Sequence, residues 1–157
     1  AIRTLRRTWT KGGAGELQLG VAGAGDLDAL RSLPPPLNRR VEQILAPRKG
    51  SRTWISVTPF VPPRFVKARG ANTLMGQVNA ELASRALPCA EQVDELPWNA
   101  ERLPLRHFVR RRGRGSAPPP ADIGYAIRLR FAKPIVGPLA LGYASHFGLG
   151  LFESVDS

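Results

Sequence analysis

Hydrophobic and polar positions alternate most clearly over residues 125–131. Apolar side chains occupy every second position there, at Tyr125, Ile127, Leu129 and Phe131. Arg128 and Arg130 fall between them. A period of two is typical of a half-buried β-strand. We therefore expect a strand whose apolar side chains face a core and whose two arginines face the opposite side.

Further strands are predicted on either side of this segment. Over residues 53–61, Ile55 and Val57 alternate with more polar neighbours, and the prolines from Pro59 onward end the pattern because proline has no backbone N–H for a sheet. Weaker patterns predict strands at residues 90–96 and 148–153, and a basic strand or strand end at residues 105–112.

The helical patterns are fewer. Leu74, Val78 and Leu82 recur four residues apart, which places them on one face of a helix. We expect this helix to begin at a cap on Asn72 and to end near Ala86. A shorter helix is expected at residues 38–45, and a single helical turn at residues 138–143.

The order of these elements predicts the fold class and the domain division. After residue 52 it reads β-α-β-β-α-β, which is typical of an α+β, ferredoxin-like antiparallel sheet with helices on one face. A glycine-rich loop precedes the last strand. Residues 1–52 are rich in glycine and proline, so we expect an irregular arm or linker from a missing upstream domain. Residues 53–157 then form one domain.

Composition narrows the class of partner. The 157 residues are 43% hydrophobic, enough for one core. Lys and Arg number 23 against 12 Asp and Glu, a formal net charge of +11, which indicates a polyanionic partner, with nucleic acid the leading candidate. Arginine predominates, as suits phosphate binding, although a GC-rich genome would also favour it. The single Cys89 excludes a disulfide framework and fits a reducing compartment.

Nothing in the sequence indicates a membrane protein. No apolar run approaches the roughly 18 residues of a membrane-spanning helix, and no signal peptide is visible. We therefore expect a cytoplasmic protein without a membrane partner. The chain begins with Ala1 rather than Met, which favours a piece of a longer protein.

Residues 137–152 form the most distinctive segment. They contain four glycines and His146 between apolar stretches. Glycine lets the backbone approach a ligand closely, and main-chain N–H groups in such turns often contact phosphates. Histidine is a common proton-transfer group. The alternative is a tight connection packed by its own Leu and Phe side chains, with His146 as a solvated turn residue.

Three segments of the chain resemble one known family. They are residues 54–61 (WISVTPFV), residues 110–115 (RRRGRG) and residues 137–152, which end in SHFGLGLF. Together they resemble the RAMP superfamily of CRISPR-associated proteins, and within it the fused RAMP protein of type I-G (formerly I-U) systems. That family joins an N-terminal backbone-capping domain to a C-terminal crRNA-processing endoribonuclease domain. The resemblance covers residues 53–157 and corresponds to the C-terminal half.

The resemblance implies a specific reaction and specific partners. A ribose 2′-oxygen of the CRISPR repeat RNA attacks the adjacent phosphorus and leaves a 2′,3′-cyclic phosphate and a 5′-hydroxyl. The domain then remains on the 3′ hairpin of the crRNA, beside the backbone subunits of the interference complex. No cofactor or metal is expected, and the sequence has no His/carboxylate cluster with metal-ligand spacing.

Two histidines are available for proton transfer. His146 and His107 are the candidate catalytic residues, since general acid–base catalysis contributes about 10²–10⁴-fold. The alternative for His146 is phosphate positioning or packing, and for His107 it is an ordinary strand histidine. A hydrolase triad is disfavoured because Ser145 and His146 have no matched acid.

The candidate RNA-binding residues fall into four groups. Lys67 and Arg69 lie between the first strand and the helix, and Arg128 and Arg130 lie on the sheet. The predicted clamp on the hairpin stem consists of Arg110, Arg111, Arg112 and Arg114. The glycine-rich segment contributes Gly142, Tyr143, Ser145 and Gly148. Contacts of this kind are salt-sensitive. A solvated strand face is the alternative for the sheet arginines, and packing is the alternative for Tyr143.

Three functions are therefore considered. The first is a metal-independent endoribonuclease that processes crRNA. The second is a non-catalytic RNA-binding or assembly module of the same fold. The third, a ribosomal-type basic protein, accounts for charge and size but leaves the histidine-bearing glycine segment unexplained.

Overall fold

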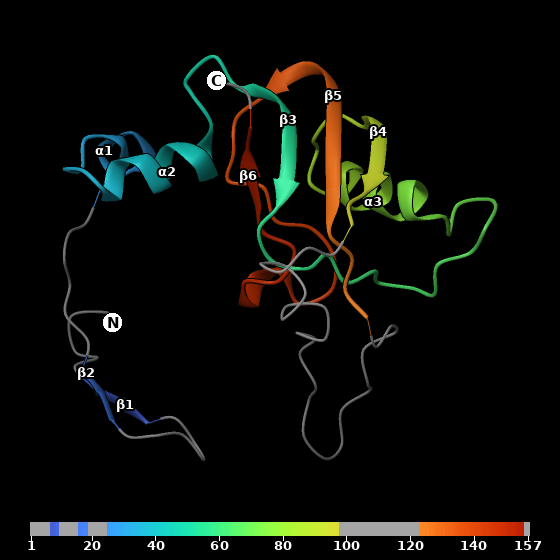
Figure 1. Ribbon diagram of the computed structural model, residues 1–157, viewed down its shortest axis with the longest axis horizontal. Helices are drawn as coiled ribbons and strands as arrows, with labels where there is room; N and C mark the ends of the chain where they lie inside the picture. The colour runs from blue at the N-terminus through green and yellow to red at the C-terminus, as the bar shows by residue number, and fades with distance from the viewer. Residues whose placement is uncertain (1–6, 10–15, 19–24, 98–122, 156–157) are drawn as a thin grey trace.

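Figure 1 shows a four-stranded sheet at the centre of the computed structural model, which describes residues 7–9, 16–18, 25–97 and 123–155. The strand order is β4-β5-β3-β6, and each neighbouring pair is antiparallel. The strands are β3 (Ser51–Ser56), β4 (Ala90–Glu95), β5 (Ile127–Ile135) and β6 (Phe152–Ser154). A separate antiparallel pair consists of β1 (Arg7–Trp9) and β2 (Glu16–Gln18).

The alternation that predicted β5 is confirmed. Ile127, Leu129 and Phe131 are each at most 2% exposed and belong to the main core. Trp54 on β3 lies opposite Leu129, is fully buried, and donates its indole N–H to the Ser51 carbonyl at 3.1 Å. Because side chains alternate across a strand, Arg128 and Arg130 lie on the face away from this core.

Helix α3 (Leu74–Ala83) covers the core face and passes behind β4 and β5 in Figure 1. Its predicted apolar stripe is confirmed, since Val78 and Leu82 are fully buried and Leu74 packs against the same cluster. β3 and β4, which α3 connects, are both antiparallel to β5 between them. The chain is thus a small α+β protein with a four-stranded antiparallel sheet and few helices, compatible with the expected ferredoxin-like fold.

Part of the predicted arm packs beside the sheet. It contains α1 (Leu27–Arg31) and α2 (Leu37–Leu45). α2 lies next to β6, and Arg40 forms a 2.7 Å ion pair with Glu153. Leu45 and Ala46 are buried, and the Leu45 carbonyl accepts a hydrogen bond from the Gly137 N–H at 2.8 Å.

The strand predicted at residues 53–61 is shorter than expected. β3 ends at Ser56. Beyond it, the Val57 N–H donates to the Leu151 carbonyl at 2.7 Å, and Phe60 forms an isolated bridge with Tyr125. Pro59 offers no N–H to a neighbouring strand. The Thr58 hydroxyl instead donates to the Gly148 carbonyl at 2.7 Å and accepts from the Leu151 N–H at 2.9 Å.

The helical turn predicted at residues 138–143 is wrong. Ala140 pairs with Leu151 in an antiparallel bridge, so this stretch is extended. The short helix is instead the 3₁₀ turn η3 (Ser145–Phe147). The last strand also begins later than predicted, at Phe152. Gly148 and Gly150 both have positive φ, a conformation that a regular strand does not use.

Other boundaries also differ from the prediction. β5 begins two residues after its predicted start at Tyr125 and ends four residues after its predicted end at Phe131. α2 begins one residue before the predicted start, and β4 ends one residue before the predicted end. α3 is capped by the hydroxyl of Thr73, not by Asn72, and ends three residues before Ala86. The pair β1–β2 and helix α1 were not predicted. The basic strand expected at residues 105–112 lies outside the described residues.

Candidate nucleic-acid interface

Residues 137–152, here called the glycine loop, join β5 to β6 and fold back on themselves. The Leu141 N–H donates to the Gly150 carbonyl, and the Phe152 N–H donates to the Leu139 carbonyl, each at 2.9 Å. Leu139 and Leu141 are buried in the main core. The loop is therefore anchored in the sheet by its own apolar side chains.

Two glycines allow this tight course. Gly142 has φ +91° and Gly150 has φ +59°. A Cβ added at Gly142 would lie 2.6 Å from the Val61 carbonyl oxygen, and one at Gly150 would overlap the Leu141 carbonyl oxygen. Glycine is required here because backbone packs directly on backbone.

The N–H groups of the glycine loop are largely used within the protein. Tyr143 donates to the Val61 carbonyl and Gly150 to the Pro59 carbonyl, each at 2.8 Å. The Gly142 N–H donates to a carboxylate oxygen of Glu81 at 2.9 Å. A phosphate would have to displace these bonds to reach the same donors. The loop thus provides a rigid base for its side chains rather than a row of free donors.

Glu81 connects the glycine loop to helix α3. The carboxylate oxygen that accepts from Gly142 also accepts from the Arg85 guanidinium at 2.9 Å. A second guanidinium nitrogen of Arg85 donates to the Ser145 hydroxyl at 3.3 Å. The side chains of Glu81 and Arg85 are 22% and 34% exposed. A cation is therefore held beside the residue that precedes His146.

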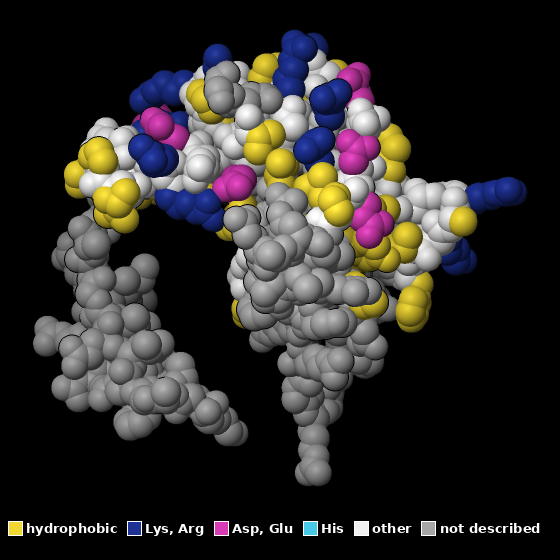
Figure 2. All heavy atoms as spheres, viewed as in Figure 1, with side chains coloured by type: hydrophobic (Ala, Val, Ile, Leu, Met, Phe, Trp, Pro, Cys, Tyr) yellow, Lys and Arg dark blue, Asp and Glu magenta, His cyan; other side chains and the backbone are white. Residues whose placement is uncertain are grey.

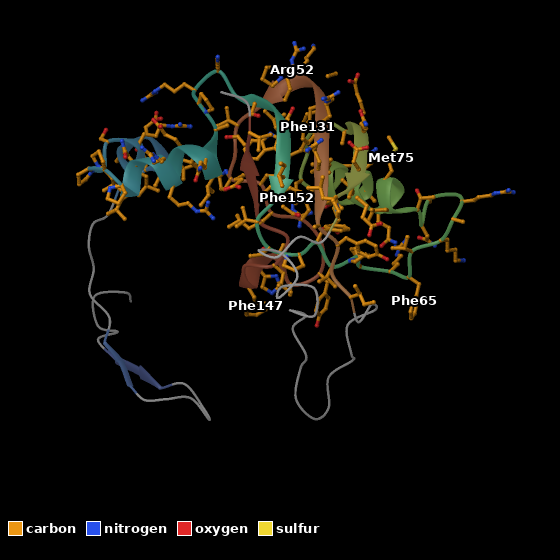
Figure 3. The ribbon with its side chains drawn as sticks, viewed as in Figure 1. Arg52, Phe65, Met75, Phe131, Phe147 and Phe152 are labelled. Carbon is orange, nitrogen blue, oxygen red and sulfur yellow. The ribbon has the colours of Figure 1, made fainter. Side chains whose placement is uncertain are left out.

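His146 lies on the exposed turn η3. The turn is flanked by Ala144 and Gly148, both in the left-handed region. The ring of Phe147 contacts that of His146, with centroids 4.2 Å apart and planes tilted by 47°. Phe147 is 56% exposed and is labelled in Figure 3. The turn thus presents an imidazole and an aromatic ring to solvent on a well-fixed backbone.

The other glycine-loop candidates have structural contacts. Tyr143 packs against the small cluster of Val61, Ala144 and Leu149, and its hydroxyl is buried with no hydrogen-bond partner among the described residues. These contacts favour packing for Tyr143. The Gly148 carbonyl accepts a hydrogen bond from the Thr58 hydroxyl at 2.7 Å.

The sheet face opposite the core carries mixed charge. Arg128 lies between Ile55 and Asp94, and Arg130 lies between Thr53 and Gln92. Neither arginine forms an ion pair within the described part of the chain. Figure 2 shows Lys and Arg side chains toward the upper end of the sheet and acidic side chains along its right side. The face is thus less basic than the alternation alone suggested.

Lys67 and Arg69 lie on residues 62–73, here called the Phe65 loop, between β3 and α3. Both side chains are exposed. The Lys67 N–H donates to the Asn72 carbonyl at 2.9 Å, which closes the loop. The hydrophobic and polar pattern of the sequence did not point to Phe65, which is 75% exposed in the middle of this loop.

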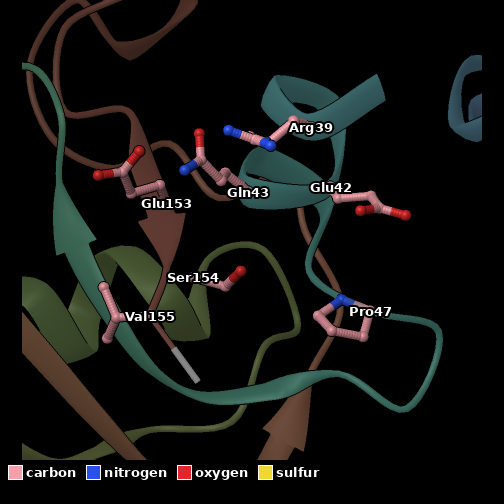
Figure 4. A pocket seen from close by; sticks show the side chains of 7 residues that line it. All are labelled: Arg39, Glu42, Gln43, Pro47, Glu153, Ser154 and Val155. Atoms are coloured by element: carbon pink, nitrogen blue, oxygen red, sulfur yellow. The ribbon is translucent and has the colours of Figure 1, made fainter. Parts of the chain in front are cut away.

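A cavity of about 390 Å³ lies between α2 and β6 (Figure 4). In the close-up, Arg39 and Gln43 extend from α2 toward β6, which carries Glu153. The lining mixes acidic and basic side chains, and Glu153 is already paired with Arg40. The charges at this cavity therefore largely balance one another.

Several predicted site residues lie outside the described residues. They are His107, Arg110, Arg111, Arg112 and Arg114. The structure brings Ser145, His146 and the glycine loop together with Arg85 and Glu81, which sequence reasoning missed. The only sequence signal for that pair is a Glu and an Arg four residues apart on a helix, a spacing typical of any exposed helix face.

In the described ranges, no three His, Cys, Asp or Glu side chains gather closely enough to hold a metal ion. Within the same ranges, no helix is both long and apolar enough to span a membrane. Comparisons with family models, curated proteins and solved structures found no match to this chain.

Proposed function

We propose that this chain is a ferredoxin-like RAMP domain that binds CRISPR repeat RNA in the cytoplasm and cleaves it without a metal. The single observation that carries the proposal is the exposed His146 on the rigid turn η3, beside the Arg85–Ser145 pair. The strand order β4-β5-β3-β6 supports the fold part of the proposal.

The chemistry follows from the groups that the turn presents. Attack of a ribose 2′-oxygen on phosphorus needs a base to take the proton of the 2′-hydroxyl and an acid to protonate the departing 5′-oxygen, and an imidazole serves in either role. The transition state also gains negative charge, which a nearby guanidinium stabilises. Arg85 is in place to do this if the scissile phosphate lies over Ser145. His107 is the sequence-derived candidate for the second proton transfer.

One observation favours the second candidate function, a non-catalytic RNA-binding module on the crRNA hairpin. The N–H groups of Gly142, Tyr143 and Gly150 are bonded inside the protein. These N–H groups would then stabilise the conformation of the loop and would not donate hydrogen bonds to a transition state. In this case His146 and Phe147 contact RNA without transferring a proton.

The deciding experiment uses labelled repeat RNA in EDTA with the wild type, His146→Gln and His107→Gln. We expect His146→Gln to lower the cleavage rate by about 10²–10⁴-fold while RNA binding persists. The wild-type product should carry a 2′,3′-cyclic phosphate. Arg39→Gln, at the α2 cavity, is the control and should cleave normally. Tight binding without cleavage by the wild type would establish the binding module instead.

A further inference from the structure

The Phe65 loop is held in one conformation by a buried amide. Gln77 on α3 is 4% exposed. Its side-chain oxygen accepts from the Arg64 N–H at 2.9 Å, and its nitrogen donates to the carbonyls of Phe65 at 3.4 Å and Asn72 at 3.1 Å. A buried polar side chain that satisfies three backbone groups fixes the loop where it leaves and rejoins the fold.

The same loop presents a large aromatic ring to solvent. Phe65 is 75% exposed. Val66, the next residue, is 36% exposed, and Met75 on the first turn of α3 is 41% exposed. Figure 3 shows the Phe65 ring extending away from the fold. A single exposed apolar residue is ordinary on a protein surface, but a ring held outward by a fixed backbone is preorganised for contact.

The charges around Phe65 indicate the kind of partner. Residues 62–73 contain Arg64, Lys67 and Arg69 and no acidic residue. All three side chains are exposed, and none of them forms an ion pair or side-chain hydrogen bond within the described part of the chain. An aromatic ring among unpaired cations is the arrangement with which proteins bind single-stranded nucleic acid, stacking a base on the ring and pairing phosphates with the cations.

A hollow lies between this loop and helix α3. It has a volume of about 220 Å³ and extends from Pro63, Arg64 and Asn72 on the loop to Ala80 and Glu81 on α3. Glu81 also accepts from Gly142 and Arg85. Glu81 thus both lines this hollow and contacts the glycine loop at Gly142.

We infer that the Phe65 loop is a binding site for unpaired RNA, in which one base stacks on Phe65 and the adjoining phosphates contact Arg64, Lys67 and Arg69. The inference rests on the proposed function for its partner, RNA, but not on cleavage. It assigns the single-stranded flank of the RNA to this loop.

The test compares the binding of fluorescently labelled unpaired RNA and of a blunt RNA duplex by wild type and Phe65→Ala. We expect Phe65→Ala to weaken binding of unpaired RNA by about 5- to 100-fold, as loss of one stacked base does, and to leave duplex binding within about twofold. Met75→Ala removes a neighbouring exposed apolar side chain and should leave both affinities unchanged. Unchanged thermal unfolding of Phe65→Ala confirms that the fold is intact.

Charge-reversal variants distinguish RNA binding by the cations of this loop from non-specific attraction of RNA to a positively charged protein. Lys67→Glu/Arg69→Glu should weaken unpaired RNA binding and flatten its salt dependence. Arg39→Glu/Lys49→Glu, with the same change in net charge, should have a much smaller effect. The inference would be overturned if Phe65→Ala left the affinity for unpaired RNA unchanged, or lowered the affinities for unpaired and duplex RNA equally. Either result would leave the proposed nuclease activity possible. Phe65-dependent binding without cleavage would overturn only the nuclease. Absence of RNA binding would overturn both.

Discussion

The glycine loop and the Phe65 loop are both rigid, but they use their polar groups in opposite ways. In the glycine loop the main-chain N–H groups are bonded inward, one of them to the Glu81 carboxylate. In the Phe65 loop the buried Gln77 satisfies the backbone, and the cations and the aromatic ring point to solvent. Glycine content thus marks tight main-chain packing here, and contacts with a ligand fall to exposed side chains. These are His146 and Phe147 in the glycine loop, and Phe65 with its neighbouring cations in the Phe65 loop.

The largest effect is expected when a side chain is introduced into the glycine loop, which tests whether its glycines are needed for main-chain packing. We expect Gly150→Ala to lower the free energy of unfolding by about 3 kcal/mol, since it combines a positive φ with a clash against backbone. At Gly148 φ is also positive, but nothing lies within 4 Å of an added Cβ. Gly148→Ala should therefore cost only about 1 kcal/mol. Urea denaturation measures both, and equal losses would refute the packing role of Gly150.

The Phe65 loop is tested by removing its buried amide. Gln77→Leu leaves the Arg64 N–H and the Phe65 carbonyl without their partner, whereas the Asn72 carbonyl keeps the Lys67 N–H. We expect a loss of about 2 kcal/mol in the free energy of unfolding. Hydrogen exchange at residues 64–72 should also become faster. Gln92→Leu is the control, because Gln92 is exposed and, within the described part of the chain, its side-chain amide donates to the Asp94 carboxylate alone. If both variants lose the same stability, Gln77 does not hold the loop.

The smallest effect is expected at the carboxylate that joins α3 to the glycine loop. Glu81→Gln keeps an acceptor for the Gly142 N–H but removes the negative charge facing Arg85, and we expect a loss of about 1 kcal/mol. Glu95→Gln on β4, where the described residues include no ion pair to Glu95, should change stability little. Denaturation of the two variants at low and moderate salt is the measurement. Equal stability of Glu81→Gln and the wild type would show that the charge is unimportant.

The sequence indicated the sheet better than the connections. Alternation placed Ile127, Leu129 and Phe131 in the core, and the four-residue spacing placed Val78 and Leu82 on the buried face of α3. Burial of one face imposes these periods on the chain directly. The helical turn expected at residues 138–143 failed because Leu139 and Leu141 are buried by extended pairing rather than by helical packing.

The features of the candidate site likewise differ in whether the sequence alone could predict them. By itself, the sequence determined the strand and helix cores, the net positive charge and the position of His146 between glycines. Only the tertiary structure decided which N–H groups are already bonded, that Arg85 and Glu81 meet the glycine loop, and that Phe65 is exposed. The physical reason is that periodic burial is written in neighbouring positions, whereas a hydrogen-bond partner 61 residues away, as Glu81 is from Gly142, is set by how the elements pack.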